Sequence, residues 1–290
     1  MSSTVFRLFI FTCLQCLVHI SMGNESVEFL IDQSITNLQK IKVKYQSLAI
    51  IKKLYGDCAP CRPIKENKYC DYTFLAPMQD CLEFRQAGYR KSGIYRLSGP
   101  GFNRPNVLCD QTSQGWGWTI LLRRQDGTVD FIQGWKSYKH GFGRLTGEFW
   151  LGNEIVHDLT KSSVATNGSE LLINMRIQGQ TRNVFAKYGT FSDGDEASKY
   201  TLQIADVSGN APHLTGPRSF MGYHNGMKFS TYDNDNDAGS SHCAQSKGGW
   251  WFGHCYITFL TEKFTNGLIW FSDGKLVKMQ FVEMKFRRKL

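Results

Sequence analysis

The stretch from Ser230 to Cys255, called the acidic segment below, reads STYDNDNDAGSSHCAQSKGGWWFGHC. It places Asp233, Asp235 and Asp237 at alternate positions, with asparagines between them. Carboxylates at this density are poor material for a strand, and they are the oxygen ligands that calcium prefers. Two cysteines and two tryptophans follow and would hold the segment in one shape. The pattern predicts a calcium-organised, disulfide-pinned loop that builds a surface for recognition.

Residues 1–23 have the features of a secretory signal. Arg7 precedes an apolar run over 8–20, and Ser21 and Gly23 supply small residues at the usual cleavage positions. The run is too short to span a bilayer, although a signal anchor remains the alternative. We therefore expect a secreted, extracellular chain without membrane insertion.

Secretion changes how the nine cysteines are interpreted. Cys13 and Cys16 would leave with the signal, and in an oxidising compartment the others are candidates for disulfides rather than nucleophiles. Their number is odd, which indicates a bond between chains. The remaining cysteines are Cys58, Cys61, Cys70, Cys81, Cys109, Cys243 and Cys255.

The region 24–56 has the apolar spacing of an amphipathic helix. It is either a short coiled coil, which would make the chain a homo-oligomer, or a helix packed on its own domain. Residues 57–69 form a proline-containing linker that carries Cys58 and Cys61, and these could lock neighbouring chains together. Sequons for N-glycosylation begin at Asn24 and Asn167.

From residue 70 to residue 290 the chain is rich in aromatic residues and glycines, with short strand-like runs and a few helical patterns. This mixture predicts one α+β domain, long enough to bury its own core. The strand-like runs are 93–97, 119–123, 171–177, 200–207 and 277–286, and the helical patterns are 79–87 and 149–159.

An ordered set of motifs runs through this region: Gly117-Trp-Thr-Ile-Leu-Leu-Arg-Arg-Gln-Asp-Gly127, Gly147-Glu-Phe-Trp-Leu-Gly-Asn153, Phe185-Ala-Lys-Tyr188, Asp233-Asn-Asp-Asn-Asp237 and Trp250-Trp251 before Cys255. Together they resemble the fibrinogen C-terminal domain, as found in ficolins, tachylectins, angiopoietin-like proteins and the fibrinogen chains. The resemblance implies an antiparallel sheet with short helices and, after about Met221, a loop-rich P subdomain ordered by calcium. It also implies two disulfides, Cys81–Cys109 and Cys243–Cys255, which leaves Cys58, Cys61 and Cys70 as candidates for a bond between chains.

The calcium site implied by the resemblance is not an EF-hand. That loop requires glycine and glutamate where this chain has Ala238 and Ala244. In the family pattern the second and third aspartates bind calcium by side chain, and two later carbonyls complete the shell. The ligands expected here are Asp235, Asp237, Gly239 and Ser241.

Family lectins bind an acetyl group beside the second P-subdomain cysteine. The resemblance implies a cis peptide bond between His254 and Cys255, amide donors at Cys255 and Tyr256, and later wall residues at Phe264 and Thr265. Lys247 stands where relatives have a wall tyrosine, and its charge would favour an anionic ligand over an acetyl group.

Composition argues against two other classes. The formal net charge is +9, but the basic residues are scattered, so nucleic acid is not an expected partner. The histidines lack metal-ligand spacing, and no nucleophile elbow or phosphate loop is present, so we expect no enzyme. Asp193, Asp195 and Glu196 are expected in an exposed turn, and the paired tryptophans of the acidic segment are expected in the core.

Two functions remain open. The first is a secreted, calcium-dependent lectin that binds acetylated glycans on microbial or cell surfaces in innate defence. The second is a ligand for a surface protein, either a receptor-binding factor or a self-assembling matrix or clot component, that uses the same surface. A retained acetyl pocket favours the first function, and a pocket altered by Lys247 favours the second.

Overall fold

The computed structural model describes residues 78–98, 105–113, 115–164, 167–212, 214–216, 219–272 and 274–289. The predicted signal, N-terminal helix and linker lie outside these residues, as do Cys58, Cys61, Cys70 and Asn24. Within the described part, no helix is both long and apolar enough to cross a bilayer.

Among the described residues, a ten-stranded antiparallel sheet forms the body of the domain. Its main path runs β1-β2-β3-β10-β6-β7-β8, while β4, β5 and β9 pair beside it. The strands are β1 (Gly93–Arg96), β2 (Asn106–Asp110), β3 (Trp118–Arg124), β4 (Phe142–Gly143), β5 (Phe149–Trp150), β6 (Ser169–Ile177), β7 (Asn183–Asp193), β8 (Leu202–Gly209), β9 (Leu268–Ser272) and β10 (Lys275–Arg288).

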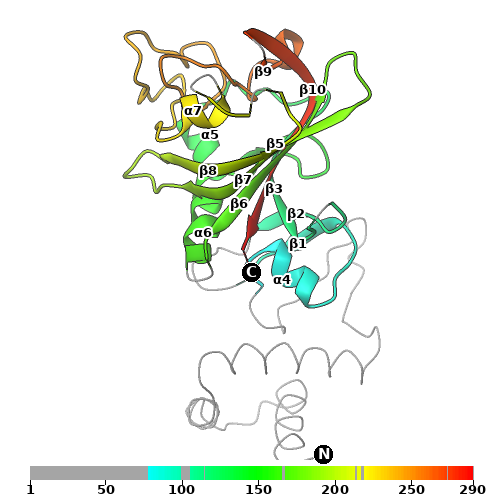
Figure 1. Ribbon diagram of the computed structural model, residues 1–290. Coiled ribbons are helices and arrows are strands. Elements are labelled where there is room, and N and C mark those ends of the chain that lie inside the picture. The colour runs from blue at the N-terminus through cyan, green and yellow to red at the C-terminus, as the bar shows by residue number, and fades with distance from the viewer. Residues whose placement is uncertain are drawn as a thin grey trace, which may run out of the picture. The chain divides into compact units, whose positions relative to one another are not determined.

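Strand β10 is the centre of the sheet (Figure 1). It is 14 residues long and pairs with β3 on one side and β6 on the other. Its register with β3 shifts between Met284 and Lys285, which is the signature of a β-bulge. Apolar and charged side chains alternate along its second half, so one face of the sheet faces the core and the other is polar.

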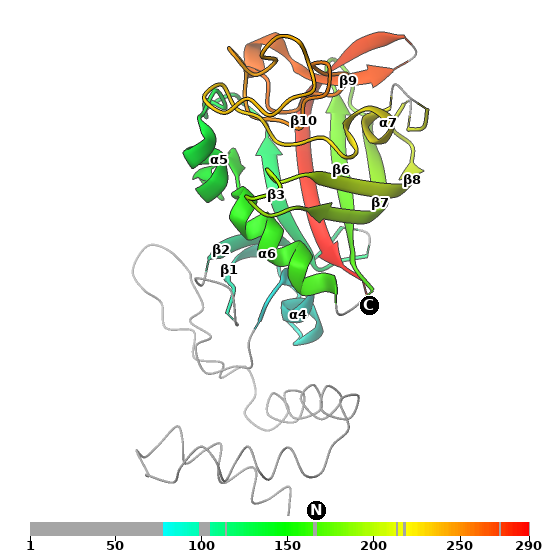
Figure 2. The ribbon, with the colours of Figure 1, turned by 90° about the vertical axis from the view of Figure 1, so that its left-hand side faces the viewer.

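Short helices complete the fold. They are α4 (Cys81–Gln86), α5 (Trp135–His140), α6 (Asn153–Ser163) and α7 (Phe220–His224), with one 3₁₀ turn, η2 (Phe264–Asn266). Asp80 begins α4 because its carboxylate accepts the Glu83 N–H at 2.8 Å. Helix α6 lies across one face of the sheet (Figure 2) and buries Val156 and Leu159.

The loop-rich part predicted after about Met221 is confirmed. Between α7 and β9 the described backbone forms only isolated bridges and the turn η2. Figures 1 and 2 place this part at one end of the sheet, with α4, β1 and β2 at the other. The two predicted disulfides are also present: Cys81–Cys109 joins α4 to β2, and Cys243–Cys255 closes the acidic segment.

A buried ion pair ties the sheet to this loop-rich part. Arg124 and Glu148 are 1% and 0% exposed, and their charged groups lie 3.5 Å apart. Glu148 accepts backbone N–H groups of the turn after β3, including Gln125 at 2.8 Å. Arg124 donates to the carbonyls of Leu260 and Glu262, at 3.2 and 2.9 Å. Because each charge also has backbone partners, the pair can stay ionised in the core.

Several sequence expectations need correction. The helical pattern at 149–159 begins as strand β5, and the helix itself starts at Asn153. The strand expected from Tyr200 starts at Leu202, because Lys199 and Tyr200 both have a positive φ, 60° and 49°, which ends regular pairing. Asp193 is 2% exposed, so it is not part of the exposed turn that includes Asp195 and Glu196.

Candidate functional site

The acidic segment is anchored by its two tryptophans. Trp250 and Trp251 are fully buried, which confirms the core placement expected for them. Trp250 forms an antiparallel bridge with Ser230, and the Trp251 indole N–H donates to the Tyr200 carbonyl at 2.8 Å. A Cβ at the preceding Gly248 would collide with the Thr261 carbonyl, so only glycine allows the approach. The base of the segment is therefore fixed by the core.

Asp233 serves the neighbouring helix. Its Oδ1 accepts the Trp135 N–H at 2.8 Å and the Thr231 hydroxyl at 2.7 Å. Trp135 is the first residue of α5, so Asp233 caps that helix from far along the chain. Burial alone would raise the pKa of Asp233, but these two hydrogen bonds hold it below its usual value. Asp233 is also not among the calcium ligands that the family pattern implies.

Asp237 organises the turn that follows. Its Oδ1 accepts the Gly239 N–H at 2.8 Å, and its Oδ2 accepts the Cys243 N–H at 2.9 Å. A Cβ placed on Gly239 would lie 3.0 Å from Asp237 Oδ1 and 3.1 Å from the Ser241 carbonyl oxygen. A carboxylate oxygen and a carbonyl oxygen thus converge beside a residue that has no side chain. Asp235 is exposed, two residues earlier.

This arrangement fits a hard cation. Each carboxylate oxygen has two lone pairs, so Asp237 can accept its backbone N–H groups and still bind an ion. No three His, Cys, Asp or Glu side chains gather as metal ligands within the described part of the chain. A calcium site would therefore rest on Asp235 and Asp237 together with backbone carbonyls, as the sequence predicts.

The second cysteine corrects one expectation. The described residues include no cis peptide bond, so the bond between His254 and Cys255 is trans. The chain turns here because Cys255 has a φ of 69° and bridges back to Gly253. His254 is exposed, and its carbonyl accepts the Tyr223 hydroxyl at 2.6 Å. The left-handed backbone conformation of Cys255 and this hydrogen bond form the turn for which a cis peptide bond was expected.

A buried histidine supports that turn. The Nδ1 of His224 donates to the Trp251 carbonyl at 2.8 Å, and its Nε2 accepts the Thr258 N–H at 3.1 Å. Because Nε2 must accept, the ring is neutral. Burial lowers the pKa of His224 to about 4, and the hydrogen bond to Trp251 opposes this shift only in part. Sequence reasoning missed this role, since an isolated histidine carries no spacing signal.

Lys247 lies over two aromatic rings, those of Tyr256 and Phe259, called the aromatic floor below. Its Nζ is 3.2 Å from Glu262 Oε2 and lies over the rings of Tyr256 and Phe259, at 5.2 and 5.8 Å from their centroids. Burial by itself would lower the pKa of Lys247, but the Glu262 carboxylate raises it above its usual value. The lysine charge is therefore matched within the chain, which weakens the expectation of an anionic ligand.

The other two predicted wall residues are Phe264 and Thr265. Phe264 begins η2 and packs against the turn at Gly127, where an added Cβ would meet the Phe264 Cβ at 2.8 Å. Thr265 is exposed. The structure thus brings Lys247 to Tyr256, whereas Phe264 packs on the turn after β3. Asn167 is exposed with a φ of 75°, so its sequon stays a prediction on an accessible side chain.

Comparison with known proteins gives a consistent set of matches. The family model for the fibrinogen beta and gamma chains, C-terminal globular domain, matches residues 77–289. Tenascin-R of Gallus gallus is 38% identical over 222 residues, which are 73% of this chain and 16% of tenascin-R. Angiopoietin-related protein 7 of Mus musculus is 38% identical over 223 residues, or 72% of this chain and 63% of that protein. The chain thus spans less than two thirds of either relative.

Solved structures agree with these matches. The fibrinogen-like globe domain of human ANGPTL2 has a TM-score of 0.66 and 33% identity, covering 74% of this chain and 100% of that one. Lamprey fibrin D-dimer, complexed with the peptide ligand Gly-His-Arg-Pro-amide, has a TM-score of 0.64 and 26% identity, covering 98% of this chain and 94% of that one. The chain belongs to the fibrinogen C-terminal domain family.

Proposed function

We propose that this chain is an extracellular binding protein whose acidic segment contacts a protein partner. The observation that carries the proposal is the position of Lys247, which covers the Tyr256 ring and is held there by Glu262. In the acetyl-binding pattern a tyrosine wall would stand at that position. A fixed ammonium group over the aromatic floor disfavours a methyl group as ligand, because it puts a solvated charge where an apolar wall is needed.

The relatives support the same conclusion. Tenascin-R and angiopoietin-related protein 7 match at 38% identity, and the lamprey fibrin D-dimer carries a short peptide ligand. These matches favour a protein as the partner, and an acetyl-sugar lectin is the competing hypothesis.

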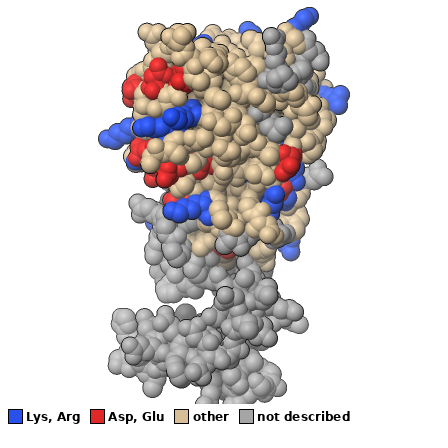
Figure 3. Space-filling model, turned by 60° about the vertical axis from the view of Figure 1, so that its left-hand side comes forward, with Lys and Arg blue, Asp and Glu red and all other residues tan. Residues whose placement is uncertain are grey.

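Tyr232 is the candidate contact residue. It is 46% exposed, although large hydrophobic side chains are mostly buried among the described residues. Tyrosine is enriched in binding hot spots because it combines a large apolar ring with a hydroxyl. Separately, Figure 3 shows one face of the molecule on which an area without Lys, Arg, Asp or Glu lies between charged side chains.

We further propose that Asp235 and Asp237 hold a calcium ion together with the carbonyls of Gly239 and Ser241. The convergence of Asp237 Oδ1 and the Ser241 carbonyl beside Gly239 supports this assignment. Bound calcium would supply fixed positive charge that keeps the acidic turn folded. The donor set, two carboxylates with carbonyls and water, suits the millimolar calcium of extracellular fluid.

The test measures binding of the fluorescently labelled full chain, with calcium present, to extracellular matrix deposited by cultured cells. One matrix sample is treated with trypsin, one with glycosidases, and one is left intact with free N-acetylglucosamine as competitor. We expect trypsin treatment to abolish binding, and we expect neither the glycosidases nor the free sugar to reduce it. Loss of binding after glycosidase treatment, or competition by the sugar, would overturn the proposal in favour of the lectin.

Matched variants tie the result to the acidic segment. Tyr232→Ala should weaken binding about tenfold or more, as expected of a hot-spot tyrosine. Leu276→Ala is the control, because Leu276 is 53% exposed and lies on the β9–β10 hairpin. Equal loss in the two variants, or none in Tyr232→Ala, would place the contact outside the acidic segment.

A further inference from the structure

A polar cavity of about 520 Å³ opens on the face of the sheet that carries the charged side chains of β10. It contains no residue of the acidic segment, and its size falls within the usual range for small-molecule sites. Its lining comes from β2 and the loop after it, and from β6, β7 and β10: Asp110, Thr112, Ser113, Asn174, Met175, Arg176, Asn183, Phe281, Glu283 and Lys285.

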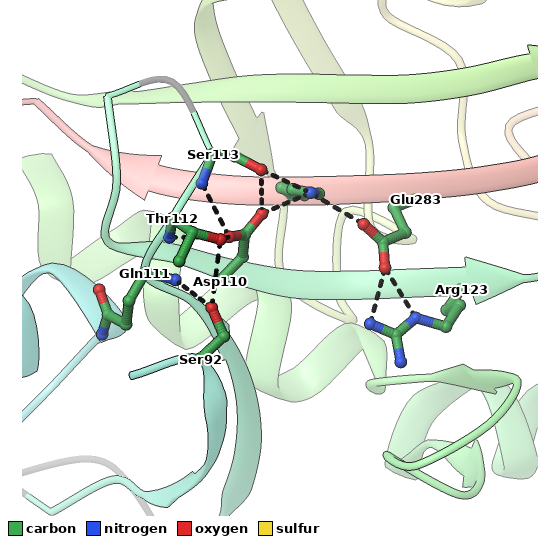
Figure 4. Close-up of polar contacts among 8 residues, drawn as sticks. Ser92, Asp110, Gln111, Thr112, Ser113, Arg123 and Glu283 are labelled. Atoms are coloured by element: carbon green, nitrogen blue, oxygen red, sulfur yellow. Dashed lines mark hydrogen bonds and ion pairs between the residues drawn. The ribbon is translucent and has the colours of Figure 1, made fainter. Parts of the chain in front are cut away.

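One wall of the cavity belongs to a series of ion pairs between neighbouring side chains, drawn in Figure 4. Lys285, whose side chain is 3% exposed, lies 2.7 Å from Asp110 Oδ2 and 2.8 Å from Glu283 Oε2. Arg123 in turn lies 2.7 Å from Glu283. Two carboxylates and two cations therefore neutralise one another. Ser113 and Thr112 also donate to Asp110, so this wall offers a ligand neither net charge nor an unused carboxylate.

The other side of the cavity carries Arg176, a cation without a counter-charge among the described residues. Arg176 pairs with Phe281 in the register of β6 and β10, and its guanidinium lies 5.6 Å from the centre of that ring. It forms no ion pair with any residue that the structure describes. Its Nε is shielded from solvent and has no hydrogen-bond partner there either. A shielded donor of this kind is costly unless something accepts from it.

Two amides lie beside Arg176. Asn183 is its partner across the β6–β7 pair, and Asn174 is two residues earlier on β6, on the same face of the sheet. Both line the cavity. A guanidinium binds a planar carboxylate through two parallel hydrogen bonds, and amide side chains can donate to the same oxygens or to hydroxyls next to them.

We propose that this cavity binds a small carboxylate-bearing ligand, with Arg176 holding the carboxylate and the amides of Asn174 and Asn183 orienting the rest. Together with Arg123, the wall residues Asp110, Glu283 and Lys285 carry no net charge, so an anion can approach without repulsion. This site shares no residue with the proposed protein-binding surface, so each can fail without the other.

The test is titration of the ¹⁵N-labelled full chain, followed by NMR, with three probes. D-glucuronate carries a carboxylate and hydroxyls, D-glucose is the same ring without the charge, and N-acetylglycine is a carboxylate of the kind that ends a peptide. We expect D-glucuronate, N-acetylglycine or both to shift the amide signals of 174–176 and 183, and D-glucose to bind at least tenfold more weakly. The acid that binds more tightly identifies the source as saccharide or peptide. Equal binding of glucose and the acids, or shifts confined to other residues, would overturn the proposal.

Variants separate the guanidinium from general surface charge. Arg176→Gln should lower the affinity for the acids about tenfold or more. Asn183→Asp, at an exposed position, should lower it severalfold by placing an anion at the rim. Arg182→Gln removes the same charge as Arg176→Gln, but from an exposed arginine next to Asn183 in the sequence, and should leave the affinity unchanged. An Arg182→Gln effect as large as that of Arg176→Gln, or unaltered affinity in a folded Asn183→Asp variant, would overturn the site.

Discussion

Asp193 and His224 show how single buried groups control this domain. Asp193 ends β7, is 2% exposed, and has no hydrogen bond of standard geometry to either carboxylate oxygen among the described residues. Burial raises the pKa of Asp193 well above its usual value, and the Trp251 indole opposes that shift only in part. His224 is buried as a neutral ring, so in both cases the core selects the uncharged form.

For Asp193 we predict that Asp193→Asn stabilises the domain at neutral pH, by about 1–2 kcal/mol. In the folded protein Asp193 keeps a proton that it releases in the unfolded chain once the pH exceeds the ordinary pKa of an aspartate. The wild-type domain therefore loses stability as pH rises from about 4. The amide has the same shape and does not titrate. Urea unfolding at pH 7 and pH 4.5 measures the effect, which should shrink at the lower pH.

The control for this variant is Asp158→Asn, which removes the same charge from the less buried α6 surface. Its effect should stay below about 0.5 kcal/mol at both pH values. A destabilised Asp193→Asn at pH 7 would show that the carboxylate is ionised and has a partner in the folded protein.

For His224 the predicted pH dependence has a defined window. The pKa in the folded protein is lowered from 6.5 to about 4, so the unfolded state binds more protons between these values. Stability is complete above about pH 6.5 and is lost as pH falls toward 4, by about 3 kcal/mol in all. Unfolding free energies measured over this range should fall more steeply in the wild type than in His224→Gln. Parallel curves would rule out the histidine as the titrating group.

At the scale of elements, the sequence predicted what local pattern and spacing encode. Strands β3, β6 and β10 follow their hydrophobic runs, and both disulfides follow the family motifs. Strand β7 was missed although Val184, Ala186 and Tyr188 alternate with more exposed residues, the period-two signal of a strand.

Other features have no local signal at all. Helix α5 is capped by Asp233, which lies 98 residues away. Lys247 and Tyr256 meet where the chain folds back at the Cys243–Cys255 disulfide. Arg176 and Lys285 share a cavity through the β6–β10 pairing, whose register a sequence pattern does not supply.

The calcium loop gives a prediction at this scale, because its two aspartates differ. Asp237 accepts two backbone N–H groups, whereas among the described residues the Asp235 carboxylate accepts only the Asp237 N–H, at 3.2 Å. We expect Asp235→Ala to lower the melting temperature in millimolar calcium and to change it little in chelator, because an ion stabilises the state that binds it. Asp237→Ala should destabilise under both conditions, since the turn loses its acceptors.

Differential scanning calorimetry with calcium and with chelator measures both variants. The wild type should melt at a higher temperature with calcium than without it. A wild type insensitive to calcium, or an Asp235→Ala variant equally destabilised under both conditions, would show that this turn holds no ion.

At the scale of the whole molecule, the cysteine count leads to a prediction about how copies of the chain associate. The two disulfides use Cys81, Cys109, Cys243 and Cys255, and the nine cysteines of the chain form an odd number whether or not Cys13 and Cys16 leave with a signal. At least one thiol therefore has no partner within the chain. We infer that in an oxidising compartment such a thiol pairs between chains. The amphipathic helix predicted at 24–56 would favour this pairing if it forms the coiled coil rather than packing on its own domain.

We predict that the secreted chain runs as a covalent oligomer on a non-reducing gel and as a monomer after reduction. Replacing Cys58, Cys61 and Cys70 by serine one at a time should identify the linking residue, because only its loss converts the oligomer to a monomer or a smaller species.

Linked copies would bind a repetitive surface far more tightly than one domain can, since later contacts form at high effective concentration. The triple serine variant is therefore expected to keep its melting temperature but lose most of its binding to matrix. A wild-type chain that runs as a monomer without reductant would contradict the interchain bond, and unchanged matrix binding by the triple variant would show that a single domain suffices.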